Sequence, residues 1–124
     1  MKISVITACF NSQKTIAEAI ESLKRQSWPF IEHLVIDGAS QDASVAIASK
    51  TLGDGDGLIS EPDRGIFDAL NKGLQRASGD VIGFLNSDDL FAHDNVLRRV
   101  AACFNDPNVG AVYGDLQYVD ADDT

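Results

Sequence analysis

Two adjacent carboxylates, Asp88 and Asp89, directly follow Asn86-Ser87 and an apolar run at residues 81–85. A buried strand ending there would place two hard oxygen ligands at the edge of a sheet. Such a pair is repulsive unless a cation lies beside it. Because ligands of open α/β sheets bind just beyond the carboxyl ends of strands, the pair predicts a metal–phosphate site. The alternative is a solvated turn and N-cap before a helix that begins near Asp94.

A further carboxylate, Asp37, ends the apolar run at residues 34–36 and precedes Gly38. A carboxylate at a strand end can accept hydrogen bonds from a ribose hydroxyl or from the N–H of a base. The alternative is a turn-forming Asp-Gly, with Asp42 capping the next helix.

The third polar group is Arg64 with Asp68 and Lys72, at the start of an expected helix. An arginine beside free backbone amides is a candidate phosphate contact. Asp68 and Lys72 are four residues apart, so the alternative is an ordinary surface ion pair worth a few tenths of a kcal/mol.

The spacing of apolar residues predicts the strands and helices that carry these groups. Strands are predicted at residues 3–10, 31–37, 58–60 and 81–85, and a strand pair at residues 109–113 and 116–119. Helices are predicted at residues 14–25, capped by Ser12, after Asp42, at residues 66–77, and after Asp94. In the third helix we expect one buried face, which consists of Ile66, Leu70, Leu74 and Ala77. This alternation predicts an α/β fold with a mostly parallel sheet and helices on both faces.

The composition excludes several classes of protein. The chain has 124 residues, enough for one domain, and no apolar stretch long enough for a membrane span. Its formal charge of −9 argues against nucleic acid as a partner, and an anionic ligand would require a cation or a few placed basic residues. Cys9 and Cys103 are expected to be reduced thiols and His33 a structural residue.

Taken together, these residues resemble the family 2 nucleotide-sugar glycosyltransferases of the GT-A fold. The resemblance runs through Ser4-Val5-Ile6-Thr7-Ala8-Cys9-Phe10-Asn11 and Val35-Ile36-Asp37-Gly38-Ala39-Ser40-x-Asp42. It continues in residues 22–27, 61–73 and 77–80 and ends in Asn86-Ser87-Asp88-Asp89. No single stretch is specific, but the ordered set is.

The resemblance implies transfer of a sugar, with inversion, from a nucleotide-diphosphate sugar to a hydroxyl of a saccharide or lipid-linked acceptor, as in polysaccharide biosynthesis. It implies that Asp37, Thr7 and Asn11 bind the nucleotide. It also implies that Asp88 and Asp89 hold Mn²⁺ or Mg²⁺ on the diphosphate, where the ion would neutralise the leaving group. Residues 63–72, with Arg64, Asp68 and Lys72, match the second donor-side motif of the family.

The resemblance also implies that the catalytic base comes from a later, acceptor-side segment, beyond Thr124. We therefore expect residues 1–124 to be the nucleotide-sugar-binding part of a catalytic domain that is truncated on the acceptor side. Apolar sheet surface exposed near residues 109–119 would then favour a homo-oligomer. The expected location is cytoplasmic, or peripheral at the inner face of a membrane.

Two alternatives belong to other classes of protein. An inactive nucleotide-sugar-binding module would have the donor site without the base. A phosphoacceptor receiver domain is also small, acidic and α/β, but it needs its acidic pair directly after the first strand, where this chain has Ala8-Cys9-Phe10-Asn11.

Overall fold

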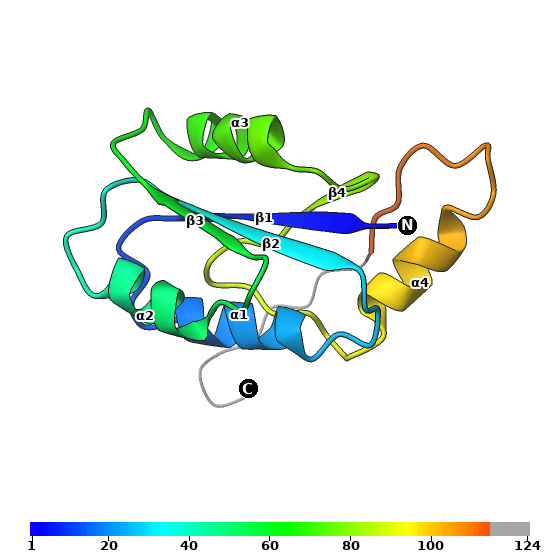
Figure 1. The fold of residues 1–124 in the computed structure, drawn as a ribbon, viewed down its shortest axis with the longest axis horizontal. Coiled ribbons are helices and arrows are strands. Elements are labelled where there is room, and N and C mark those ends of the chain that lie inside the picture. The colour runs from blue at the N-terminus through cyan, green and yellow to red at the C-terminus, as the bar shows by residue number, and fades with distance from the viewer. Residues whose placement is uncertain (115–124) are drawn as a thin grey trace.

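Strands and helices alternate along the computed structural model, which describes residues 1–114 (Figure 1). The elements are β1 (Ile3–Cys9), α1 (Ile16–Lys24), β2 (Ile31–Asp37), α2 (Ser44–Thr51), β3 (Gly57–Ser60), α3 (Ile66–Arg76), β4 (Val81–Phe84) and α4 (Val96–Cys103). No helix among residues 1–114 is both long enough and apolar enough to cross a membrane.

The four strands form one parallel sheet in the order β3-β2-β1-β4. Ile3 is paired with Ile31 on one side and with Val81 on the other. The chain moves outward from β1 through β2 to β3 and then returns to the other side of β1. A crevice for ligands is therefore expected between the carboxyl ends of β1 and β4, where the direction of winding changes.

Helices cover both faces of the sheet, which confirms the predicted fold class (Figure 1). On one face, the side chains of Ile16 and Ile20 in α1 are fully buried against Cys9, Val35 and Ala48. The α4 helix extends the same layer through its buried Leu97 and Ala101. On the other face, α3 packs over β1 and β2.

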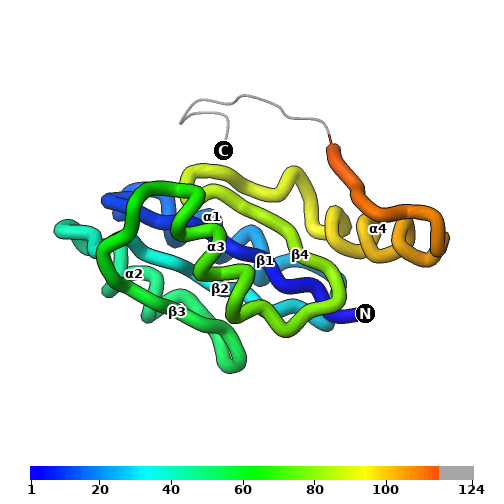
Figure 2. Tube along the Cα trace, turned by 90° about the horizontal axis from the view of Figure 1, so that it is seen from above, coloured from blue at the N-terminus to red at the C-terminus, as the bar shows by residue number. Residues whose placement is uncertain are grey.

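The prediction for the buried face of α3 is wrong at two of its four positions. Ile66 and Leu74 are 49% and 45% exposed, whereas Ala69 and Gly73 are buried. The reason is a close approach: a Cβ atom at Gly73 would lie 2.5 Å from Cγ2 of Ile6. Small residues therefore face the sheet, and the larger ones lie along a flank of α3. Seen from above, β4 lies beside α3 rather than beneath it (Figure 2).

Two of the predicted N-caps are also wrong. The Ser12 side chain does not cap α1, because only its backbone carbonyl accepts hydrogen bonds, from the amides of Thr15 and Ile16. The N-cap position of α4 is Asn95 rather than Asp94, and it makes no side-chain cap bond. At the cap predicted before α2, the Asp42 carboxylate does accept a backbone amide at the start of the helix, that of Ser44 at 2.9 Å.

The strand predicted at residues 109–113 is not formed, and these residues have no regular structure. Their β-branched and aromatic side chains favour a strand only where a neighbouring strand supplies hydrogen bonds. The partner strand predicted at residues 116–119 lies outside the described residues.

Candidate functional site

A cleft of about 620 Å³ opens at the carboxyl ends of β1 and β4. It is formed by the loop after β1, the loop before α2, the start of α3 and the turn after β4. Its lining residues are Ala8, Asn11, Ser12, Gln13, Lys14, Thr15, Asp42, Ile66, Asn86, Ser87 and Asp88. The cleft therefore lies where the strand order predicts a ligand.

Asn11 lines this cleft in a fixed conformation. Its φ of 47° lies in the left-handed region, where asparagine is one of the few residues other than glycine that is common. Its side-chain oxygen accepts the amide of Gln41 at 2.9 Å, and its own amide donates to Oγ of Ser40 at 2.8 Å. The loops after β1 and β2 are thereby joined across the sheet edge.

Asp37 lies below this surface and is only 1% exposed. One carboxylate oxygen accepts the amide of Ser40 at 2.9 Å and Oγ of Ser60 at 2.8 Å, and the other accepts the Ser40 hydroxyl. Burial raises the pKa of Asp37, but these hydrogen bonds outweigh burial and leave its pKa below the usual value. Burial, together with the Asp37 charge, raises the pKa of the Cys9 thiol to about 11. Asp37 is a fixed buried anion and does not line the cleft.

Thr7 is fully buried, so in this structure it cannot contact a ligand in the cleft. Its hydroxyl lies 2.7 Å from Nε2 of His33, which is 2% exposed. Burial lowers the pKa of His33 to about 4, against a smaller opposing effect of Asp56. This agrees with the prediction that His33 is a structural residue.

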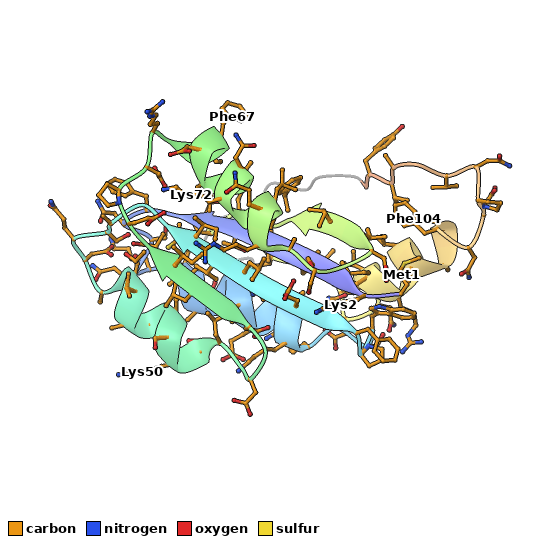
Figure 3. The ribbon with its side chains drawn as sticks, turned by 45° about the horizontal axis from the view of Figure 1, so that its top comes forward. Met1, Lys2, Lys50, Phe67, Lys72 and Phe104 are labelled. Carbon is orange, nitrogen blue, oxygen red and sulfur yellow. The ribbon has the colours of Figure 1, made fainter. Side chains whose placement is uncertain are left out.

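The side chains of Asp68 and Lys72 in α3 contact the loop that precedes the helix and contains Arg64. The Asp68 carboxylate accepts the backbone amide of Arg64 at 3.0 Å. Nζ of Lys72 donates to the carbonyl of Pro62 at 3.1 Å and lies 3.2 Å from Glu61 and 3.9 Å from Asp68 (Figure 3). Of the binding residues predicted in this segment, which are Arg64, Asp68 and Lys72, none lines the cleft.

The turn that carries Asp88 and Asp89 places the two carboxylates in different surroundings. The turn is closed by the amide of Asp89, which donates to the carbonyl of Asn86 at 3.0 Å. Asp88 is exposed and lines the cleft, whereas Asp89 is half-buried and does not. Within residues 1–114, no three Asp, Glu, His or Cys side chains are placed to hold a metal ion together. A cation at Asp88 would therefore be held by fewer than three side chains of these four kinds from the described residues.

Several residues of the cleft are not apparent from the sequence pattern. The pattern predicts Ser12 and Asp42 only as helix caps and indicates no role for Gln13, Lys14 and Thr15. The signal that could have identified them is position, because all five lie in the loops that follow β1 and β2. Lys14 brings a positive charge to the lining, which Arg64 does not.

The sequence profile of Glycosyl transferase family 2 matches residues 4–124. The chain belongs to this family. An uncharacterised glycosyltransferase of Mycobacterium tuberculosis is 41% identical over 98 residues, which are 78% of this chain and 37% of that protein. The PGL/p-HBAD biosynthesis glycosyltransferase of Mycobacterium bovis is 31% identical over 117 residues, which are 91% of this chain and 46% of that protein. The chain thus spans less than half the length of these curated relatives.

Solved structures agree with this assignment. S. aureus TarS 1-349 in complex with UDP superposes with a TM-score of 0.77 at 31% identity, over 85% of this chain and 32% of that chain. The mannosyltransferase PcManGT of Pyrobaculum calidifontis, in complex with GDP-Man and Mn²⁺, gives a TM-score of 0.80 at 28% identity, over 88% of this chain and 34% of that chain. The GT-A fold expected from the sequence is therefore confirmed.

Proposed function

We propose that this chain is the donor-binding part of an inverting glycosyltransferase that takes a nucleotide-diphosphate sugar with the help of a divalent cation. The observation that carries the proposal is the cleft at the β1–β4 switch point, where Asp88 lies in the same lining as Asn11 and Lys14.

The electrostatics of the cleft favour a cation on the diphosphate. Carboxylate oxygens of Asp42 already accept the amide of Gln13 at 3.2 Å and the amide of Ser44 at 2.9 Å, just before α1 and at the start of α2. These amides are not free to bind a phosphate, and Asp42 adds a negative charge beside it. Lys14 and a cation on Asp88 would offset that charge, with phosphate oxygens completing the ion's ligands. When bound, Mn²⁺ or Mg²⁺ would neutralise the leaving diphosphate.

The donor class follows from the relatives. TarS has been crystallised with UDP and UDP-GlcNAc, and PcManGT with GDP-Man and Mn²⁺. We propose that this chain likewise binds a uridine or guanosine diphosphate sugar. Asn11 would contact the nucleotide directly, whereas the buried Asp37 and Thr7 would support its pocket from beneath. Asp89, Arg64, Asp68 and Lys72 would act on the donor only through the loops that they shape.

The acceptor side of the proposal rests on family membership. The acceptor would be a saccharide or lipid-linked hydroxyl, deprotonated by a base outside residues 1–124, and the location cytoplasmic or peripheral to a membrane. An inactive nucleotide-sugar-binding module remains the second candidate, because the described residues contain no group that we assign as a base. With the base outside residues 1–124, both candidates predict donor binding without efficient transfer by these residues alone. Transfer to a panel of acceptors is therefore measured with an acceptor-side segment present: turnover supports the glycosyltransferase, and binding without turnover supports the module.

The test of donor binding is calorimetric titration with UDP and with GDP, first in Mn²⁺ and then in chelator. We expect tighter binding in Mn²⁺, and we expect Asp88→Asn to remove that gain. Lys14→Gln should weaken binding about tenfold, as expected for loss of a charge-assisted contact to phosphate. Lys50→Gln, on α2, is the matched control and should change nothing (Figure 3). Equal affinity of the unaltered chain in Mn²⁺ and in chelator would contradict the metal role.

A further inference from the structure

Ser12 connects three segments that meet at the cleft. Its amide donates to Oγ of Ser44 at 2.7 Å, in the first residue of α2. Its own hydroxyl lies 3.1 Å from the carbonyl of Phe10 and 2.8 Å from Oγ of Ser87, in the turn after β4. The last contact joins residues 75 positions apart in the chain.

The Ser12 hydroxyl has one proton; the Phe10 carbonyl can only accept it, whereas either hydroxyl can donate in the contact between Ser12 and Ser87. With the Ser12 proton on Phe10, Ser87 donates to Ser12 and its oxygen keeps lone pairs for the cleft beside the Asp88 carboxylate. In either arrangement the 2.8 Å contact fixes the Ser87 side chain in the turn that carries Asp88.

The backbone amide of Ser12 also has a defined hydrogen-bond partner. Ser44 is fully buried, and its hydroxyl donates to Oδ1 of Asp42 at 2.6 Å, so its oxygen is free to accept the Ser12 amide. The result is a continuous series of hydrogen bonds from Asp42 through Ser44 and Ser12 to Ser87. It links a carboxylate at the start of α2 to the acidic turn after β4.

We propose that Ser12 is a positioning residue for the cation site, because it fixes the Ser87 hydroxyl and with it the turn that carries Asp88. This inference rests on the proposed metal-assisted donor binding and assigns the geometry of that site to a residue that does not itself touch the ion. Removal of the Ser12 hydroxyl should therefore weaken nucleotide affinity in the presence of the cation more than it weakens the metal-free affinity.

The experiment measures UDP affinity of the full chain in Mn²⁺ and in chelator, for Ser12→Ala, Ser87→Ala and the double variant. We expect Ser12→Ala to reduce the gain from Mn²⁺ about threefold to tenfold, the size of one lost hydrogen bond, and to lower affinity in chelator by a smaller factor. The double variant should lose no more than either single variant, because both remove the same contact. Ser49→Ala, at an exposed position of α2, is the matched control.

Three results would overturn the inference. One is an unchanged Mn²⁺ gain in Ser12→Ala, while Asp88→Asn abolishes that gain. The second is an equal loss in Mn²⁺ and in chelator, which indicates a general structural role. The third is a double variant whose loss is the product of the two single losses. If Ser12→Ala does not fold, Ser87→Ala tests the same contact from its other partner. An unaltered chain with no Mn²⁺ gain would instead overturn the proposed function, and the inference with it.

Discussion

The two faces of the sheet differ in how completely their apolar side chains are buried and in the hydrogen bonds of the adjoining loops. On the α1–α2 face, Ile16 and Ile20 are fully buried, and the loops at the sheet edge are joined by hydrogen bonds between side chains and amides. On the α3 face, Phe67, Leu74 and Phe84 are 79%, 45% and 54% exposed. The Phe67 side chain projects away from the sheet (Figure 3).

This difference indicates that the two faces have different roles. Hydrogen bonds that join loops distant in sequence favour a fixed cleft, as donor binding requires. Exposed apolar side chains that gather on one face are typical of an interaction surface. We therefore expect ligand binding at the edge shared with the α1–α2 face, and we propose the apolar flank of α3 and β4 as a surface for self-association.

Substitutions on the α1–α2 face should lower the free energy of unfolding most. Ile20→Ala should lower the free energy of unfolding by about 2–5 kcal/mol, because it leaves a cavity in a fully buried cluster. Leu74→Ala is the matched change on the other face and should cost less than about 1 kcal/mol, since nearly half of Leu74 is already in contact with solvent. Urea denaturation of both variants measures the difference. Equal losses would contradict the contrast between the faces.

A second effect depends on pH and belongs to the α1–α2 face, where His33 lies on the same side of β2 as Val35. The pKa of His33 is about 4 in the folded chain and 6.5 ordinarily, so the unfolded chain binds more protons between these values. This contribution to stability is complete above pH 6.5 and is lost as the pH falls toward 4. From about pH 7 to pH 5 we expect a loss of about 2 kcal/mol.

His33→Gln isolates this contribution, because it removes the titrating ring and leaves the carboxylates unchanged. Urea denaturation between about pH 7 and pH 5 should show a shallower decline for this variant than for the unaltered chain. Parallel curves would show that His33 does not titrate in this range.

The smallest effect on stability is expected on the exposed flank. Phe84→Glu combined with Leu74→Glu should change the free energy of unfolding by about 0.5 kcal/mol or less for each substitution. We propose that the same substitutions reduce self-association, because they place charge on the apolar surface. Sedimentation velocity at several concentrations measures this, with Phe30→Glu, at another exposed aromatic position, as the control. Unchanged association would contradict a homo-oligomer through this flank.

Much of the fold followed from local patterns. The apolar runs at residues 34–36 and 81–85 predicted strands, and the alternation with helices predicted the parallel sheet that the structure contains. Periodicity could not indicate which flank of α3 is buried. That depends on the distance between α3 and β1, which Gly73 and Ile6 set together.

Local sequence was enough to predict carboxylates at strand ends, since Asp37 and Asp88 each follow an apolar run. Which of them reaches the cleft depends on tertiary packing, because Asp88 lines the cleft while Asp37 is buried beneath Ser40 and Ser60. The strand ends are local, because apolar runs and turn residues define them. The exposure of a carboxylate and the contact between Ser12 and Ser87 depend on how distant loops pack, and no local pattern contains that information.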